Sequence, residues 1–273
     1  MPPVIRSNAR GGLRRLALLA SLATVVALGV GPLAHPADVA AGTAETMEGN
    51  LLGWVNAERT RRGLVPLRLH GSLVSYSGER ATQMASTGQL KHPSCLSCVL
   101  ASRGIQNYSN GETISYTTWP WGSQAAESIF NGWKRSTIHW GLLMSTKFNY
   151  VGIGVAYRSA NKSSWAAAVL TESVDGTRPW ATFGGARRNG TSVSWTWSGG
   201  DTPLQTHTSG LRNFDIAYRI GSGSWSMIRS ATTATSLSLS GLASGQYHGL
   251  RVRARDNRGN LSLFSVELRV WVP

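Results

Sequence analysis

The only two cysteines of the chain, Cys95 and Cys98, lie three positions apart and shortly after His92. This spacing suits three chemistries: a local disulfide, a redox-active dithiol, or a zinc site completed by His92. Leu96-Ser97 between the cysteines and the lack of a preceding βαβ pattern argue against the redox dithiol. In an exported protein the simplest outcome is a disulfide that pins the loop after His92, and we expect this one.

The first part of the chain has the layout of an export signal. Four arginines precede an apolar run over residues 16–33, and small residues follow it up to Ala41. We predict a secretory signal over residues 1–41, and therefore a secreted, extracellular protein that can associate with the cell envelope. An uncleaved membrane anchor is the alternative, because the run reaches the minimal span of ~17 residues.

The net charge of +14 raises the question of an anionic partner. An anionic cell-wall polymer and lipid headgroups are both compatible with an exported chain. Nucleic acid is a poor candidate, because the basic residues are accompanied by no recognition motif and no base-stacking pattern.

Residues 42–172 predict one domain that contains both helices and strands. Apolar residues recur at helical spacing in three segments: 47–61, 72–87 and 123–136. Gly88 is expected to end the second helix, and Ser123 to cap the third. Apolar and small or polar residues alternate in two segments, 151–157 and 165–169. These segments predict two antiparallel strands with a turn near Ala160-Asn161.

From about residue 174 the pattern changes to a period of two, with no helical stripe. Short strands separated by Gly, Ser and Asn turns are predicted in five segments: 193–197, 214–220, 237–239, 250–254 and 266–272. We assign residues 173–179 to a linker and residues 180–273 to an all-β sandwich. The fold class of the whole chain is therefore α+β.

The second half carries several pieces of one recognisable pattern. These are Tyr218-Arg219 ahead of Trp225, the string LASGQY (242–247) and the string RVRARDNRGN (251–260). Together they resemble a fibronectin type III domain, which implies an immunoglobulin-like spacer or adhesive module.

The resemblance also assigns a role to Tyr247. It matches the corner tyrosine, whose hydroxyl bonds back to the backbone in such sandwiches. The family usually places a valine four residues after this tyrosine, whereas Val252 comes five residues after it. Gly249 is therefore expected to sit in a bulge.

Strand alternation places arginines on the side of the second domain that faces away from the core. Arg251, Arg253 and Arg255 alternate with apolar residues, and Arg219 and Arg269 take the corresponding faces of their strands. In a fibronectin-type topology these strands share one sheet, which predicts an exposed anion-binding stripe. The alternative is a face that is only solvated.

Six strings stand out in the first half, in this order: VNAER (55–59), GLVPL (63–67), LKH (90–92), GETI (111–114), WKRSTIH (133–139) and YVGIGV (150–155). As an ordered set they resemble the CAP superfamily of cysteine-rich secretory, antigen five and pathogenesis-related proteins, in its bacterial secreted (SCP-like) form. The resemblance implies an α-β-α sandwich over residues 42–172.

The same resemblance implies a ligand cleft lined by two histidines and one or two glutamates, which hold a divalent metal in some members. By motif position, His92 and His139 are the histidines, Glu112 is one glutamate, and Ser136 stands where some members carry the other. Thr113 also replaces the usual asparagine, so weak metal affinity is expected. Two imidazoles and a carboxylate suit zinc or another divalent metal, and a hydrogen-bonded polar network is the alternative.

We therefore expect a binding module rather than an enzyme. The chain has no Gly-x-Ser-x-Gly elbow and no His-Glu-x-x-His helix. The resemblance implies a lipid- or sterol-like ligand, or a surface protein as partner. Trp119 and Trp121 flank Pro120 in a loop that is able to line an apolar groove, although we favour packing onto the core.

The alternative activity is metal-dependent hydrolysis. In that case His92 and His139 would hold the metal, and Glu112 would act as the base.

Overall fold

The computed structural model describes residues 36–273, with side chains described from residue 44 onward. Most of the predicted signal therefore lies outside the described residues. The first element is helix α1 (Pro36–Arg61), which begins earlier in the chain than the predicted apolar stripe. Among the described residues, no helix is both long and apolar enough to cross a membrane.

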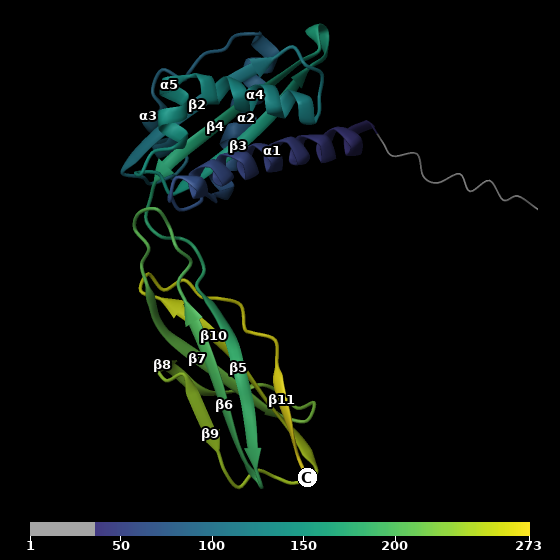
Figure 1. Ribbon diagram of the computed structural model, residues 1–273, viewed down its shortest axis with the longest axis vertical. Helices are drawn as coiled ribbons and strands as arrows, with labels where there is room; N and C mark the ends of the chain where they lie inside the picture. Colours follow the sequence, from purple (N-terminus) through teal and green to yellow (C-terminus); the bar gives the residue numbers. More distant parts are fainter. Residues whose placement is uncertain (1–35) are drawn as a thin grey trace, which may run out of the picture.

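The first domain is a four-stranded sheet between helices (Figure 1), with the strand order β1-β3-β4-β2. The short strand β1 runs parallel to β3, and the other neighbouring pairs are antiparallel. The strands are β1 (Arg68–Leu69), β2 (Ser109–Thr117), β3 (Tyr150–Arg158) and β4 (Ser163–Glu172). The helices after α1 are α2 (Gly71–Thr87), α3 (Leu96–Ser102), α4 (Ser123–Arg135) and α5 (Thr137–Leu143).

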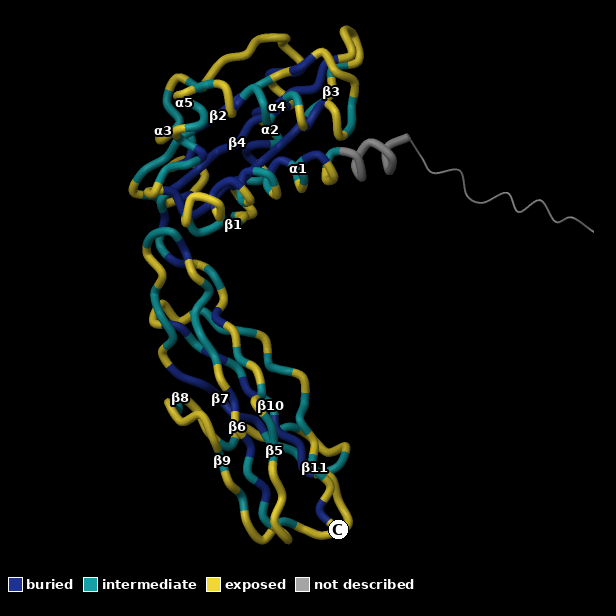
Figure 2. Tube along the Cα trace, viewed as in Figure 1, coloured by how far each residue is buried: buried dark blue, intermediate teal, exposed yellow. Residues whose placement is uncertain are grey.

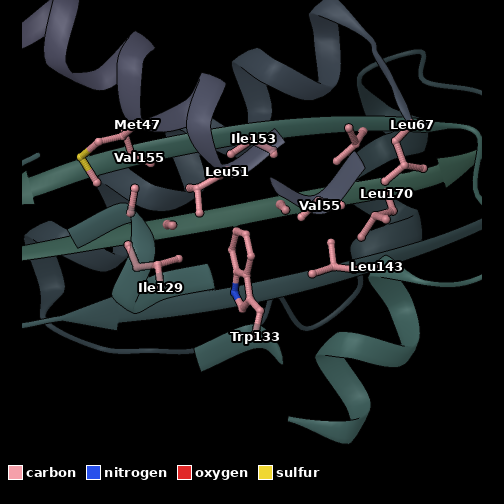
Figure 3. Close-up of a cluster of buried hydrophobic side chains, with 14 of the residues drawn as sticks. Met47, Leu51, Val55, Leu67, Ile129, Trp133, Leu143, Ile153, Val155 and Leu170 are labelled. Carbon is pink, nitrogen blue, oxygen red and sulfur yellow. The ribbon is translucent and has the colours of Figure 1, made fainter. Parts of the chain in front are cut away.

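Side-chain alternation along the central strands creates the three layers. Val151, Ile153 and Val155 of β3 share a buried cluster with residues of α1 and α4, among them Leu51 and Trp133 (Figure 3). Residues of the opposite parity, such as Tyr150 and Val169, pack with α2 instead. The predicted α-β-α sandwich is confirmed.

Two glycines of β3 allow α2 to lie directly on the sheet. A Cβ built at Gly152 would lie 2.0 Å from the backbone carbon of Leu73, and one at Gly154 would lie 2.1 Å from the backbone nitrogen of Gly78. Because backbone atoms occupy these places, no side-chain rotation makes room for a larger residue. The two glycines of the string YVGIGV therefore determine how closely α2 packs on the sheet.

The three predicted helices and the β3–β4 hairpin are confirmed, with one correction at a helix start. Gly88 ends α2 in the left-handed conformation with φ 69°. Ser123 is the first helical residue of α4 and not its cap, so that prediction is wrong. Gly122, with φ 137°, makes the turn into the helix.

The second domain is a sandwich of two antiparallel sheets (Figures 1 and 2), with the strand orders β5-β6-β9 and β11-β10-β7-β8. Its strands are β5 (Trp180–Asn189), β6 (Ser192–Gly200), β7 (Leu211–Ile220), β8 (Ser226–Thr232), β9 (Ser236–Leu239), β10 (Gln246–Asp256) and β11 (Leu268–Val272). Trp195, Phe214 and Val252 meet in one core between the sheets. The predicted fibronectin type III-like sandwich is confirmed.

The corner position is occupied by His248 rather than Tyr247. His248 is fully buried, and its Nε2 lies 2.9 Å from the backbone oxygen of Ala243, five residues upstream. Tyr247 is 46% exposed and points away from the core. The spacing explains this exchange, because Val252 comes four residues after His248. Strand β10 pairs without a register shift through Gly249, so the predicted bulge is absent.

A loop of the second domain, residues 201–210, packs against the first domain. Leu204 is buried in one cluster with Leu73 and Tyr76 of α2. The side-chain oxygen of Gln205 accepts a hydrogen bond of 2.8 Å from the backbone nitrogen of Val65. The two domains are therefore joined by packed side chains as well as by the chain between Glu172 and Trp180.

Candidate functional site

The structure brings His92, Glu112 and His139 together from three different elements. His92 lies in the loop between α2 and α3, Glu112 in β2, and His139 in the first turns of α5. The Nδ1 atom of His92 lies 2.7 Å from Oε2 of Glu112, and the two imidazole rings are 6.2 Å apart between centroids. The three residues that the sequence singled out thus form one cluster.

A fourth residue, Arg80 of α2, belongs to this cluster and was missed by the sequence analysis. Its Nε donates to Oε1 of Glu112 at 2.8 Å, and its Nη2 donates to the backbone oxygen of Lys91. The Glu112 side chain is 2% exposed and that of Arg80 is 7% exposed. A buried carboxylate requires such a partner, because an unpaired charge in the interior is very costly.

Ser136 takes part in helix formation rather than in the cluster. It is the N-cap residue of α5, and its hydroxyl oxygen accepts a hydrogen bond from the backbone nitrogen of His139. Serine is a preferred N-cap residue, because its side-chain oxygen accepts a hydrogen bond from a backbone N–H group that has no partner within the helix. It thereby fixes the start of the helix that carries His139.

These residues fit a polar network better than a metal site. Both oxygens of Glu112 already accept bonds, one from the Arg80 cation and one from the His92 ring. The donor atoms of His92, Glu112 and His139 are not grouped as metal ligands are: among the described residues, only three aspartates bring such atoms within 4.8 Å of one another. Asp175, Asp201 and Asp256 lie at the domain junction, far along the chain from this cluster.

Burial, reinforced by the nearby charge of His92, lowers the pKa of His139. His139 is consequently neutral at physiological pH, and its ring can donate one hydrogen bond and accept another. The cluster as a whole therefore combines a fixed Arg–Glu pair with two imidazoles.

A pocket of about 690 Å³ opens beside His92, between α2 and the loop that follows it. Tyr76, Met84 and Val99 supply apolar surface to the pocket, and Arg80 and Lys91 supply positive charge. Glu79 and Arg103 close one side as an ion pair. His139 does not line this pocket, so His92 and Arg80 are the residues that connect it to the cluster.

The loop around the pocket is fixed by the predicted disulfide, Cys95–Cys98.

The two tryptophans that flank Pro120 differ in burial. Trp121 packs against the core and meets Tyr157 edge-on, as favoured, whereas Trp119 is 51% exposed.

The five arginines of the predicted stripe do share one sheet, but the stripe is less exposed than expected. Arg219 pairs with Glu267, and Arg253 and Arg255 both pair with Asp215. These two carboxylates hold three of the five arginine side chains, so only part of the stripe offers free charge. Arg269 and Arg251 complete the set.

Comparison with known proteins places the first domain in a family. The family model described as "CAP: Cysteine-rich secretory protein family" matches residues 52–171. No curated protein matches the chain.

Similar solved structures cover one domain or the other. A cysteine-rich secretory protein of Staphylococcus aureus is 17% identical, covers 48% of this chain and 40% of its own, and gives a TM-score of 0.39. An extracellular SCP-domain protein of Bacillus anthracis is 17% identical over 52% and 45%, with a TM-score of 0.44. This chain thus spans less than half the length of these two. An Fn3-like protein of Clostridium thermocellum is 20% identical over 36% and 96%, with a TM-score of 0.27.

The family match and the α-β-α layers agree on the same residues. Residues 52–171 therefore form a CAP domain by their match to the model of the cysteine-rich secretory protein family, and a fibronectin type III-like sandwich follows them.

Proposed function

We propose that this chain works outside the cell as a non-enzymatic binding protein, and that its CAP domain takes up an amphiphilic small molecule beside His92. The observation that carries the proposal is the pocket between α2 and the loop after it. Its volume of about 690 Å³ lies within the range of known ligand sites. An extracellular location is supported by the Bacillus anthracis structure, which is described as an extracellular protein with an SCP domain.

The lining of the pocket favours a ligand with an apolar body and an acidic head. Tyr76, Met84 and Val99 offer surface for a hydrocarbon or ring system. Arg80, Lys91 and Arg103 line the same pocket, with Glu79 as the one acidic side chain among the lining residues. Arg80 and Arg103 are paired with Glu112 and Glu79, so a carboxylate or phosphate head would meet Lys91 first, and the apolar part would remove water from the opposite wall.

The hydrolase alternative requires Glu112 as a free base. Both oxygens of its carboxylate are already engaged, one by Arg80 and one by His92, so neither is free to bind an attacking water molecule. These contacts favour binding over turnover.

The test blocks the pocket without altering the cluster. Thr87 lines the pocket on the last turn of α2, and Thr82 is exposed on the same helix outside it. A fluorescent fatty acid should bind the purified chain, T87W should weaken this binding at least about tenfold by filling the pocket, and T82W should bind normally. Equal binding by both variants would overturn the proposal.

The same purified proteins distinguish metal-dependent hydrolysis from ligand binding. Zinc-dependent hydrolysis of an ester substrate that is lost in H139A and retained in T87W would favour the hydrolase instead. Binding without turnover, with or without added zinc, is the result we expect.

A further inference from the structure

The outer face of the larger sheet in the second domain carries arginines stacked between aromatic rings. The guanidinium of Arg219 lies 4.6 Å from the ring centroid of Trp225, and that of Arg251 lies 4.3 Å from the same ring. On its other side Arg251 lies 4.2 Å from the ring of Phe264, which Arg253 also contacts at 4.8 Å. Cation–π stacking of this kind holds long side chains in one orientation before any partner arrives.

The arginines on this face outnumber its acids. The face carries five guanidiniums. Those of Arg219, Arg253, Arg255 and Arg269 share only Asp215 and Glu267 as ion-pair partners, and that of Arg251 has none among the described residues. The face therefore keeps a formal charge of +3, the difference between five cations and two anions. This excess is confined to one sheet and is positioned by the rings rather than spread over a flexible surface.

Two of the five arginines have donors to spare. Arg251 forms no ion pair among the described residues, and its buried Nε has no hydrogen-bond partner there. Arg269 approaches Glu267 only to 3.9 Å, and its side chain is 52% exposed. Since Arg269 pairs across the sheet with Gly249, two positions from Arg251, the unpaired Arg251 and the weakly paired Arg269 are diagonal neighbours on adjacent strands. Diagonal neighbours lie about 7–8 Å apart.

Exposed rings adjoin these free donors. Tyr247 and Trp271 form a cross-strand pair with ring centroids 5.0 Å apart, and both are close to half exposed. Arg269 lies 5.3 Å above the Tyr247 ring. Sugar rings pack their C–H faces on such aromatic rings, and guanidinium groups bind carboxylates in a two-pronged geometry.

We infer that this arginine–aromatic face, made by Arg251, Arg269, Tyr247 and Trp271, binds an anionic polysaccharide. The polymer lies along the face with sugar rings on Tyr247 and Trp271 and with successive acidic groups on Arg269 and Arg251. The other three arginines, Arg219, Arg253 and Arg255, pair with Glu267 and Asp215 and serve to hold the face in shape. This site is independent of the pocket in the CAP domain.

A polymer whose acidic groups repeat along its length fits better than a membrane. Arg251 and Arg269 are both held on the outer face of the sheet by contacts with aromatic rings, which suits a chain lying flat across the strands. Charge complementarity with a polyuronate is direct, because each sugar presents a carboxylate beside an apolar ring face.

The experiment measures binding of the purified chain to immobilised polygalacturonate, with neutral dextran as the reference glycan. R251Q/R269Q removes the two free cations, and R187Q/R188Q removes two exposed cations from β5 in the other sheet. We expect about a tenfold loss for the first variant, from loss of charge-assisted hydrogen bonds, and less than about twofold for the second. Since the two variants have equal net charge, any general attraction of a basic protein is controlled.

Three results would overturn the inference. These are equal weakening by both double variants, binding to dextran as strong as to polygalacturonate, and binding to vesicles of phosphatidylglycerol but not to the polymer. Arg251 is packed against two rings, so its replacement also removes packing contacts. The single variant R269Q changes only an exposed side chain and therefore serves as the control for misfolding. It should lose part of the affinity while the thermal unfolding curve stays unchanged, and full affinity in R269Q would also contradict the inference.

Discussion

Replacing Arg59 by methionine should destabilise the CAP domain far more than the same change at Arg61, two residues later. Arg59 stands in the last turn of α1 and is completely buried. Its guanidinium donates to four backbone oxygens and to one side chain of the other domain. These acceptors are Val65 at 2.9 Å, Leu143 at 2.8 Å, Ser145 at 2.9 Å, Phe148 at 3.4 Å and Oε1 of Gln205 at 3.4 Å.

The size of the effect follows from these contacts. Methionine preserves most of the aliphatic packing but leaves the carbonyls without their donor, and each buried polar group left unsatisfied costs about 1–3 kcal/mol. Part of this cost is offset, because the variant no longer buries a charge: burial lowers the pKa of Arg59 to about 10. Arg59 therefore remains protonated at neutral pH, and we expect a net loss of about 3–5 kcal/mol from the carbonyls left without a donor.

Urea unfolding combined with hydrogen exchange on α1 peptides measures this loss within the CAP domain. The matched control is R61M, since Arg61 is exposed and forms only a surface ion pair with Glu58. That pair should contribute less than about 1 kcal/mol. Equal destabilisation by R59M and R61M would refute the idea that Arg59 organises the end of the helix. R59K should recover less than half of the loss, because an ammonium group cannot reproduce the planar fork.

Three further changes test other contacts. Burial raises the pKa of Asp215, but hydrogen bonds and the Arg253 ion pair outweigh it and lower the pKa below 3.8. The ionised Asp215 therefore stabilises the fold above pH 3.8, and this stabilisation is lost as the pH falls further and the carboxylate is protonated. The unfolding free energies of the wild type and D215N should converge in acid below pH 3.8, and a constant difference would contradict this. E112Q should cost about 3–5 kcal/mol in urea unfolding, because Arg80 keeps its charge without a partner; no change would mean that water replaces the carboxylate. L204S should loosen the domain junction, giving a broader distance distribution in small-angle scattering, and an unchanged profile would show that Leu204 is dispensable.

The elements that the sequence predicted are those with several turns or a sustained alternation. Helix α2 and the β3–β4 hairpin repeat their apolar pattern long enough to be distinguished from chance. Helices α3 and α5 have seven residues each, barely two turns, so no periodicity can develop in them. Strand β2 was missed because Ser109–Thr117 is largely polar, and its pairing partner β4 rather than its own pattern makes it a strand.

The candidate site could be predicted from motifs except for Arg80. A signal for it was present in the sequence, since Arg80 occupies the apolar stripe of α2 between Tyr76 and Met84. A charged residue on the buried face of a helix requires a buried partner, and this requirement points to an internal carboxylate. Which carboxylate it meets depends on how the helix lies on the sheet, and local patterns do not contain that information.

For the arginine stripe, strand alternation predicts on which face the side chains lie but not which residues they pair with. Alternation correctly placed Arg219, Arg251 and Arg269 on one face, because period two is a property of any strand. It could not show that Glu267 would lie over Gly249 and take up Arg219. That contact exists because glycine has no side chain: a Cβ at this position would lie 1.9 Å from the Glu267 carboxylate.

The arrangement of α2 on the sheet links the fold to the cluster around His92. Gly152 and Gly154 let the helix backbone touch β3, and this close packing brings the inward-facing Arg80 within reach of Glu112 two strands away in the sheet. A Cβ at either glycine would push the helix outward and stretch this ion pair. The same shift would move Tyr76 and Met84, so the glycines of YVGIGV define both the polar cluster and one wall of the pocket.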